Sequence, residues 1–367
     1  MFKIPYVNLS AQWEEENIEL LPLISNALAS GQYINGLAVQ EFEKSIAELC
    51  NTKNCIALNS GTDALVLGLV AMGIKYGDEI ITPPNSFIAS TAAIAHIGAI
   101  PVFVDVLPDQ NLDPQKITAA ITNRTKAVMP VHLTGRMAKM DEIKLIADKH
   151  GLNIIEDAAQ AFGSRYNNLP SGKWGKVGCF SAHPLKNLNA CGDSGFVVTD
   201  DEEVASKIMM MRNHGLVDRN TVKQFGYVSR MDEIQAVILN YRIKKLPKLI
   251  ERRRKNAALY YKLLDRSKVV VSEETPLEFN TYHTFVIQSG NRDELKKELE
   301  NVGIETSIHY PVPIHLQPAA KGLGYTEGDF PLTELQSHRI LTLPINQYLT
   351  EKQIVEVSEQ VNKFSKF

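Results

Sequence analysis

The sequence predicts an α/β protein in which a mostly parallel β-sheet is covered by helices on both faces. The first observation is that short apolar runs alternate with amphipathic segments between about residues 54 and 200, a pattern typical of βαβ units and buried parallel sheets. The second is that this alternation stops near residue 230, where a long helical segment begins. The third is the length of 367 residues, which is enough for a large domain and a smaller one.

The predicted sheet lies in the first part of the chain. Its strands are expected at residues 54–59, 78–84, 100–106, 125–135, 152–159, 177–182 and 195–200. Helices are expected between them at residues 62–72, 87–97 and 140–151. The last of these helices ends at Gly151, a residue type that readily takes the left-handed conformation of a helix C-cap.

The second part of the chain begins with a helix over residues 229–264. We expect this helix to bend at Pro247, because proline removes an intrahelical hydrogen bond. Short strands (268–271, 281–289, 304–309) and helices (293–301, 333–340, 350–364) follow. The sequence therefore predicts a large domain over residues 1–240, including an N-terminal arm, and a smaller α+β domain over residues 241–367.

Composition argues against several classes of partner. With 44% hydrophobic residues, 22% charged residues and a net charge of −3, the chain lacks the basic excess of a nucleic-acid-binding protein. Its four cysteines have no metal-binding spacing and fit a reducing compartment. The N-terminus lacks the layout of a signal peptide, and no apolar run approaches the ~20 residues that span a bilayer. We expect a soluble cytoplasmic protein without a metal site or a membrane partner.

Two candidate ligand-binding positions follow predicted strands. In NSGTDAL (59–65) a strand passes into a helix, where Gly61 permits close approach of a ligand and the helix N-terminus attracts anions. The same residues would also serve as a plain N-cap. In IIEDAAQA (154–161), Asp157 lies at the carboxyl end of a strand, the edge at which open α/β sheets bind ligands. Its neighbour Glu156 faces the other way, and Asp157 could instead cap a following helix.

The third candidate is Lys186 in FSAHPLKNLNACGDSG (180–195), where small residues leave room for a bulky planar group. A desolvated lysine loses its proton more readily and becomes a nucleophile, although an exposed loop lysine is the ordinary alternative. An amine, a carboxylate and an anion site together are what pyridoxal 5′-phosphate (PLP) requires.

The sequence resembles the DegT/DnrJ/EryC1/StrS family of sugar aminotransferases, which have the fold type I of PLP-dependent transferases. The resemblance covers nearly the whole chain and is carried by the three stretches above and by residues 31–48, 77–106, 212–215, 229–239 and 309–319. By this resemblance Lys186 would form the Schiff base with PLP and Asp157 would hold the pyridine nitrogen protonated. Gln160 would lie beside the cofactor's hydroxyl group.

The remaining cofactor contacts are also implied by the resemblance. Gly61 and Thr62 match the phosphate-binding turn, and Ser181 would add a hydroxyl group to it. Phe87 matches an aromatic residue that stacks on the pyridine ring, although it could be a core phenylalanine. The chain departs from the family at Val228, where an asparagine commonly reaches the phosphate of the neighbouring subunit.

Valine cannot donate that hydrogen bond, so we expect this contact to be absent or to be replaced by Ser229 or Arg230. A subgroup of the family that performs dehydration has histidine in place of the Schiff-base lysine. Since Lys186 is present, transamination is favoured.

Family members typically form homodimers, and GQYING (31–36) is a plausible segment for reaching a neighbour.

The resemblance implies transfer of an amino group from L-glutamate to a keto-sugar, usually linked to a nucleotide. An eight- or nine-carbon keto-sugar acid is an alternative acceptor. Candidate substrate contacts, each of which could also be purely structural, are His183, Asn187, His309, Tyr310 and His315. A non-catalytic PLP-binding regulatory protein is a rival from another class. A nicotinamide-dependent oxidoreductase is disfavoured because the sequence has no G-x-G-x-x-G turn after its first strand.

Overall fold

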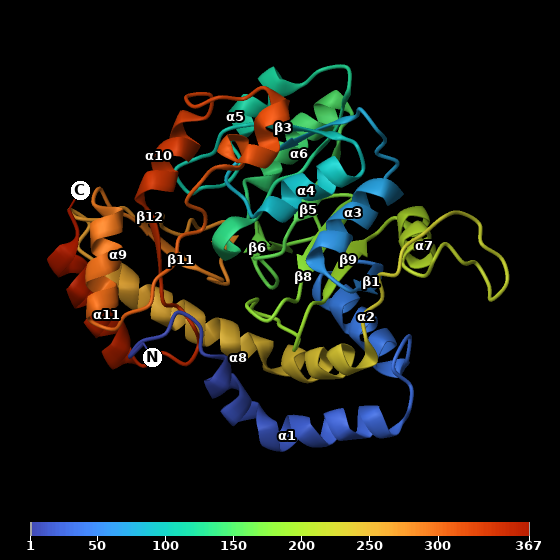
Figure 1. Ribbon diagram of the computed structural model, residues 1–367, viewed down its shortest axis with the longest axis horizontal. Helices are drawn as coiled ribbons and strands as arrows, with labels where there is room; N and C mark the ends of the chain where they lie inside the picture. Colours follow the sequence, from blue (N-terminus) through green and yellow to red (C-terminus); the bar gives the residue numbers. More distant parts are fainter. Residues whose placement is uncertain (1, 367) are drawn as a thin grey trace.

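The computed structural model describes residues 2–366, and its centre is a seven-stranded sheet in the order β1-β9-β8-β5-β4-β2-β3 (Figure 1). These strands span Asn54–Leu58 (β1), Gly195–Thr199 (β9), Val177–Ser181 (β8), Asn153–Asp157 (β5), Thr125–Val128 (β4), Glu79–Thr82 (β2) and Ile100–Phe103 (β3). Four neighbouring pairs are parallel, so the prediction of a mostly parallel sheet is confirmed. Strand β9 is antiparallel to both β1 and β8. No helix separates β8 from β9, so the chain reverses direction instead of crossing over.

The helices of the chain extend beyond those expected. They span Leu9–Ala29 (α1), Leu37–Leu49 (α2), Gly61–Ala71 (α3), Ile88–His96 (α4), Pro114–Ile117 (α5), Met140–His150 (α6), Glu202–Met211 (α7), Glu233–Leu263 (α8), Arg292–Asn301 (α9), Pro331–Arg339 (α10) and Glu351–Phe364 (α11). The predicted helices at 62–72, 87–97 and 140–151 correspond to α3, α4 and α6, and Gly151 is the left-handed C-cap of α6. Helices α1, α2, α5 and α7 were not predicted. No helix within residues 2–366 is long and apolar enough to cross a membrane.

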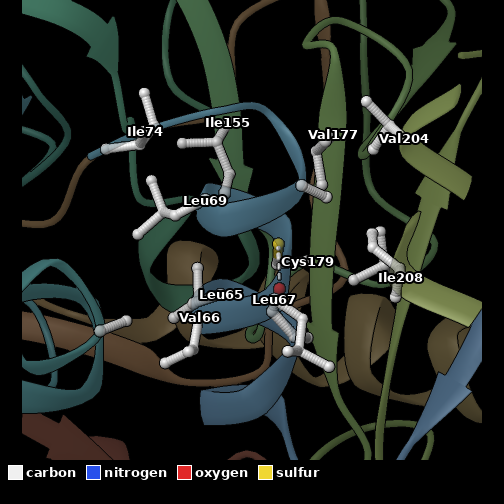
Figure 2. Packing of buried hydrophobic residues seen from close by; sticks show 14 of the residues in the cluster. Leu65, Val66, Leu67, Leu69, Ile74, Ile155, Val177, Cys179, Val204 and Ile208 are labelled. Carbon is white, nitrogen blue, oxygen red and sulfur yellow. Dashed lines mark hydrogen bonds between the residues drawn. The ribbon is translucent and has the colours of Figure 1, made fainter. Parts of the chain in front are cut away.

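Hydrophobic residues cover the sheet on both faces. On one face, Leu65, Leu67 and Leu69 of α3 pack against β5, β8 and α7, and the Cys179 thiol donates to the Ala64 carbonyl at 3.2 Å (Figure 2). On the other face, Phe180 belongs to a second cluster with residues of α2 and α8. Cys179 and Phe180 are neighbours on β8 and point to opposite faces, as the pleat of a strand requires.

Helix α8 connects the two parts of the chain. It continues through Pro247 and spans the predicted domain boundary at residues 240/241, so the division into two domains stays a prediction. Beyond it, β11 (Phe285–Gln288) and β12 (Ile340–Leu343) pair and share a hydrophobic cluster with α9 and α11. Ile4 joins this cluster and pairs with Ile304, and both chain ends lie beside α9 and α11 (Figure 1). The first residues of the predicted N-terminal arm therefore contact the C-terminal part.

Several predicted strands are shorter than expected. Of residues 125–135 only β4 is a strand, because the chain then forms a 3-10 turn in which Thr134 has a φ of 64°. Residues 268–271 and 304–309 contribute isolated bridges, formed by Val270, Ile304 and Ser307. A small sheet of β10 (Glu278–Phe279), β6 (Arg165–Tyr166) and β7 (Leu169–Pro170) was not predicted.

Candidate active site

Lys186 lies in the segment that joins β8 to β9, at the carboxyl edge of the sheet. Its side chain is partly buried, and within residues 2–366 no hydrogen bond or ion pair engages its ammonium group. Burial lowers the pKa of Lys186 to about 8, while the negative charge of Asp157 acts in the opposite direction. The two groups therefore face the same region, and Lys186 is not an ordinary solvated lysine.

This pKa predicts how the reactivity of Lys186 depends on pH in the cofactor-free protein. An ordinary lysine has a pKa near 10.5, whereas Lys186 should lose its proton around pH 8. We expect its rate of reaction with an amine-directed reagent to rise between about pH 7 and 9 and then to level off. Peptide mapping after brief labelling at a series of pH values would measure this midpoint. A midpoint near 10.5, the ordinary value of a lysine, would contradict the burial argument.

Asp157 ends β5, the strand beside β8. Its side chain is buried, and Oδ2 accepts a hydrogen bond from Ser90 Oγ at 2.6 Å. Oδ1 accepts one from the Ala159 backbone N–H at 3.2 Å. No regular helix begins at residues 158–164, so the helix-cap interpretation of Asp157 is wrong. Ser90 on α4 was not singled out in the sequence, where it is one small polar residue among several.

Glu156 is held on the opposite side of β5, as its alternation with Asp157 predicts. Its Oε2 lies 2.9 Å from His132 Nε2 and accepts from the Gly172 N–H at 2.8 Å. Its Oε1 accepts from the backbone N–H groups of Trp174 and Gly175. These partners satisfy a buried carboxylate structurally, which leaves Asp157 as the carboxylate of β5 that shares a region with Lys186.

Gln160 connects the segment that follows β5 to Tyr310 in the C-terminal part of the chain. Gln160 Oε1 accepts from the Thr134 N–H at 2.8 Å, and its Nε2 donates to Tyr310 Oη at 3.4 Å. Burial and the charge of Asp157 raise the pKa of Tyr310. The Tyr310 ring lies 5.8 Å from the ring of Phe87, whose side chain is 55% exposed. The alternative of a core phenylalanine at position 87 is therefore wrong.

The turn before α3 forms a small polar cradle next to β8. Ser60 is the N-cap of α3 and accepts from the Asp63 N–H at 3.1 Å. Within residues 2–366 the backbone N–H groups of Gly61 and Thr62 make no hydrogen bond, as expected at a helix N-terminus. A Cβ on Gly61 would lie 2.6 Å from Cβ of Ser181. The site therefore combines a helix cap, at Ser60, with two free amides beside the Ser181 hydroxyl group.

Gly61→Ala tests how closely this cradle is packed. The added methyl group would overlap Ser181 Cβ, so we expect a loss of about 1–3 kcal/mol in the free energy of unfolding and weaker binding of an anion at the turn. Thermal unfolding and titration with PLP would measure both effects. Gly322→Ala is a matched control, because a Cβ there meets no atom within 4 Å. Equal effects of the two substitutions would contradict the close approach.

The residues around the Val228 departure bind within their own chain. The Ser229 hydroxyl donates to Asn59 Oδ1 at 3.1 Å, and Arg230 Nη1 donates to Asn213 Oδ1 at 3.0 Å. The Val228 side chain is exposed. A role of Ser229 or Arg230 in replacing the missing phosphate contact stays a prediction.

Three of the candidate substrate contacts lie near Lys186. His183 is exposed beside it, and Asn187 donates to the Thr281 carbonyl at 3.1 Å. His309 Nδ1 lies 2.9 Å from Thr342 Oγ1. Burial and the charge of Lys186 lower the pKa of His309 to about 4, so its ring is neutral at physiological pH.

His315 has a different environment. Its ring is buried, Nε2 lies 3.0 Å from Glu334 Oε1, and the ring packs edge-on against Phe330. These contacts are those of a structural residue. His283, which was not predicted, lines the same cavity as Lys186. Burial and the charge of Lys186 lower its pKa well below the usual value. In the sequence it was one residue of an expected strand, which gave no sign of a site.

Comparison with known proteins identifies relatives over the full length. The profile of the DegT/DnrJ/EryC1/StrS aminotransferase family matches residues 14–362. A pleiotropic regulatory protein of Geobacillus stearothermophilus is 40% identical over 98% of each chain. The dTDP-3-amino-3,4,6-trideoxy-alpha-D-glucose transaminase of Streptomyces venezuelae is 40% identical over 99% of this chain and 96% of that protein. The crystal structure of S. venezuelae DesV with a ketimine intermediate has a TM-score of 0.96 at 40% identity, and the match covers 99% of this chain and 98% of that one.

The fold and the family agree with each other. The DesV structure matches the arrangement of the sheet and of the flanking helices over nearly the whole chain, and the family profile spans both the Lys186 segment and the C-terminal part. The predicted fold class, that of fold type I PLP-dependent transferases, is therefore confirmed. The chain belongs to the DegT/DnrJ/EryC1/StrS aminotransferase family.

Proposed function

We propose that this protein is a PLP-dependent aminotransferase that moves an amino group from L-glutamate to a keto-sugar. The observation that carries the proposal is that Lys186, whose pKa is lowered to about 8, and the buried carboxylate of Asp157 face the same region at one edge of the sheet. A lysine that loses its proton near neutral pH is suited to act as nucleophile and base. Membership of an aminotransferase family supports the same reaction.

The residues present fit PLP. The free amides of Gly61 and Thr62 and the hydroxyl of Ser181 would hold its phosphate, because a helix N-terminus favours an anion. Phe87, which is exposed toward solvent, would cover the pyridine ring. Asp157 would hold a proton on the ring nitrogen, and Gln160 would contact the ring hydroxyl. When bound, PLP supplies an electron sink for charge that develops at the substrate carbon.

Lys186 has two tasks in this reaction. Its neutral amine would hold the cofactor until the amino group of the donor takes its place. Once free, the Nζ atom would accept the proton of the donor's α-carbon and would later donate a proton in turn, as general base and acid. A pKa near 8 suits both tasks, since the amine gains and loses a proton readily near neutral pH.

The acceptor is proposed to be a nucleotide-linked keto-sugar. The Streptomyces venezuelae relative is named for a dTDP-linked amino sugar, and His183, Asn187, His309 and Tyr310 would line the acceptor's place beside Lys186. A panel of keto-sugars, free and nucleotide-linked, tested with purified protein and L-glutamate would decide. Amination of nucleotide-linked sugars supports the proposal, whereas exclusive amination of eight- or nine-carbon keto-sugar acids would replace the acceptor class.

A regulatory role is the second candidate, because one relative at 40% identity is named a pleiotropic regulatory protein. The two candidates differ in the first half-reaction. An aminotransferase converts one equivalent of L-glutamate to 2-oxoglutarate per PLP bound, without any acceptor. A protein that binds PLP but forms no 2-oxoglutarate would be the regulatory alternative.

A homodimer is the proposed assembly. The loop after α7 extends away from the rest of the molecule (Figure 1) and carries Phe225, which is 99% exposed, together with the exposed Val217 and Val222. Exposed apolar groups of this kind mark interaction surfaces. Light scattering after size exclusion should give about twice the 40.9 kDa of one chain, and Phe225→Ser should weaken the dimer. A monomeric wild type would contradict this assembly.

We also propose a cytoplasmic location, consistent with the four free cysteines.

A further inference from the structure

Arg253 is a buried cation that has no carboxylate oxygen within 4.0 Å among residues 2–366. Buried arginines within residues 2–366 are Arg136, Arg242, Arg253 and Arg292. All except Arg253 have a carboxylate oxygen within 4.0 Å. Arg253 Nη1 donates to the backbone carbonyls of Tyr282 and His283 at 3.0 and 3.2 Å. Its Nε is buried without a hydrogen-bond partner in the described chain.

Arg253 and Lys186 line the same cavity. Its volume is about 30 Å³, and no aspartate or glutamate is among the residues that line it. Three other lining residues also have a buried polar atom without a partner within residues 2–366: Asn187 Oδ1, His283 Nδ1 and Gln347 Oε1. Unpaired polar atoms of this kind are rare in folded proteins. The Arg253 Nε–H can donate to an anion, whereas the Asn187 and Gln347 oxygens accept and need a donor. Their concentration around one cavity therefore indicates a ligand that carries both an anionic group and a hydrogen-bond donor, as an amino acid does.

The charge of the cavity indicates which kind of group this is. Arg253 remains protonated at neutral pH, since burial lowers its pKa only to about 10. The nearby Tyr6 cannot neutralise it, because burial raises the pKa of the phenol to about 12. A buried charge that lacks a partner is unfavourable, and a guanidinium group pairs best with a carboxylate. The cavity is therefore suited to a small anionic group.

We propose that Arg253 binds a substrate carboxylate, and specifically a carboxylate of the amino donor. This inference rests on the proposed function, in which L-glutamate must place its α-carbon next to Lys186. A carboxylate in the cavity would pair with Arg253 while the rest of the donor extends toward Lys186. A keto-sugar acid would offer the same group in the second half-reaction, so the chemistry is shared by two possible sources.

The test measures binding without catalysis. Isothermal titration of the PLP-loaded protein with succinate, a dicarboxylate without an amino group, is compared for wild type, Arg253→Gln, Arg253→Lys and Arg252→Gln. Arg252 is the matched control, because its side chain is 37% exposed and pairs with Glu15. We expect Arg253→Gln to weaken succinate binding by about 10- to 100-fold, Arg253→Lys to weaken it less, and Arg252→Gln to bind as wild type does. Equal binding by Arg253→Gln and wild type would overturn the proposal.

Two further measurements identify which substrate supplies the carboxylate and keep the proposal testable if Arg253→Gln does not fold. Single-turnover reactions of each variant are run with L-glutamate and then with a keto-sugar acid. The substrate whose concentration for half-maximal rate rises in Arg253→Gln is the one that depends on Arg253, and a rise for either substrate supports a carboxylate site. If Arg253→Gln does not fold, the thermal stability of the wild-type protein is measured with succinate and with neutral succinamide, and equal shifts in Tm overturn the proposal. If wild type binds succinate but does not react with L-glutamate, the proposed function fails while the carboxylate site stands.

Discussion

Lys186→Ala is expected to abolish transamination, lowering kcat by at least about 10⁴-fold. The substitution removes both the amine that binds PLP covalently and the base that moves the proton at the donor's α-carbon. Formation of 2-oxoglutarate from L-glutamate measures the loss, and the absorbance of PLP shows whether the covalent link is absent. Since Gly61, Thr62 and Ser181 remain, the variant should still bind PLP non-covalently.

Lys207→Ala is the matched control for this substitution. Lys207 lies on α7 and pairs with Glu203 at 2.7 Å on the surface, so its loss should leave kcat unchanged. Lys186→Arg keeps the positive charge but has no amine that deprotonates near neutral pH, and it should be as inactive as Lys186→Ala. Wild-type turnover by either Lys186 variant would remove Lys186 from the mechanism.

Asp157→Asn is expected to have the second largest effect, lowering kcat by about 10²- to 10³-fold. The amide is nearly the same size as the carboxylate but carries no negative charge, so it cannot hold a proton on the pyridine nitrogen. The charge of Asp157 also raises the pKa of Lys186. The pH at which Lys186 becomes reactive should therefore fall below the wild-type value of about 8.

Asp148→Asn is the control, because Asp148 is an exposed residue that pairs with Lys144 on α6. It should change neither kcat nor the pH midpoint of Lys186. A loss of stability alone could lower the activity of Asp157→Asn, but it would not move that midpoint downward. An Asp157→Asn protein with wild-type kcat and an unchanged pH midpoint of Lys186 would contradict the proposed role of Asp157.

The sequence predicts those site residues that have suitable chemistry and that also lie next to a predicted strand or helix. Asp157 could be placed at the sheet edge because a buried strand precedes it, and Gly61 because a strand passes directly into a helix. Strand β9 was predicted in the right place but not in its antiparallel direction, which depends on a connection without a helix. The direction of a strand is decided by its connection rather than by its own residues.

Contacts between distant segments could not be predicted in this way. Residues 252–254 are three consecutive arginines, which in the sequence are typical of a solvated helix face. On α8 they point in different directions, so Arg253 is buried while Arg252 is paired at the surface. Ser90 donates to Asp157 from another helix. These partners become visible only when the fold brings the segments together.

The most direct test of the central claim is to find where PLP is attached. The PLP-loaded protein is reduced with borohydride, digested, and mapped by mass spectrometry. We predict one phosphopyridoxyl group per chain, on the peptide that contains Lys186, and its loss when L-glutamate is added before reduction. Attachment to another lysine, or labelling of Lys186 that L-glutamate does not prevent, would contradict the account.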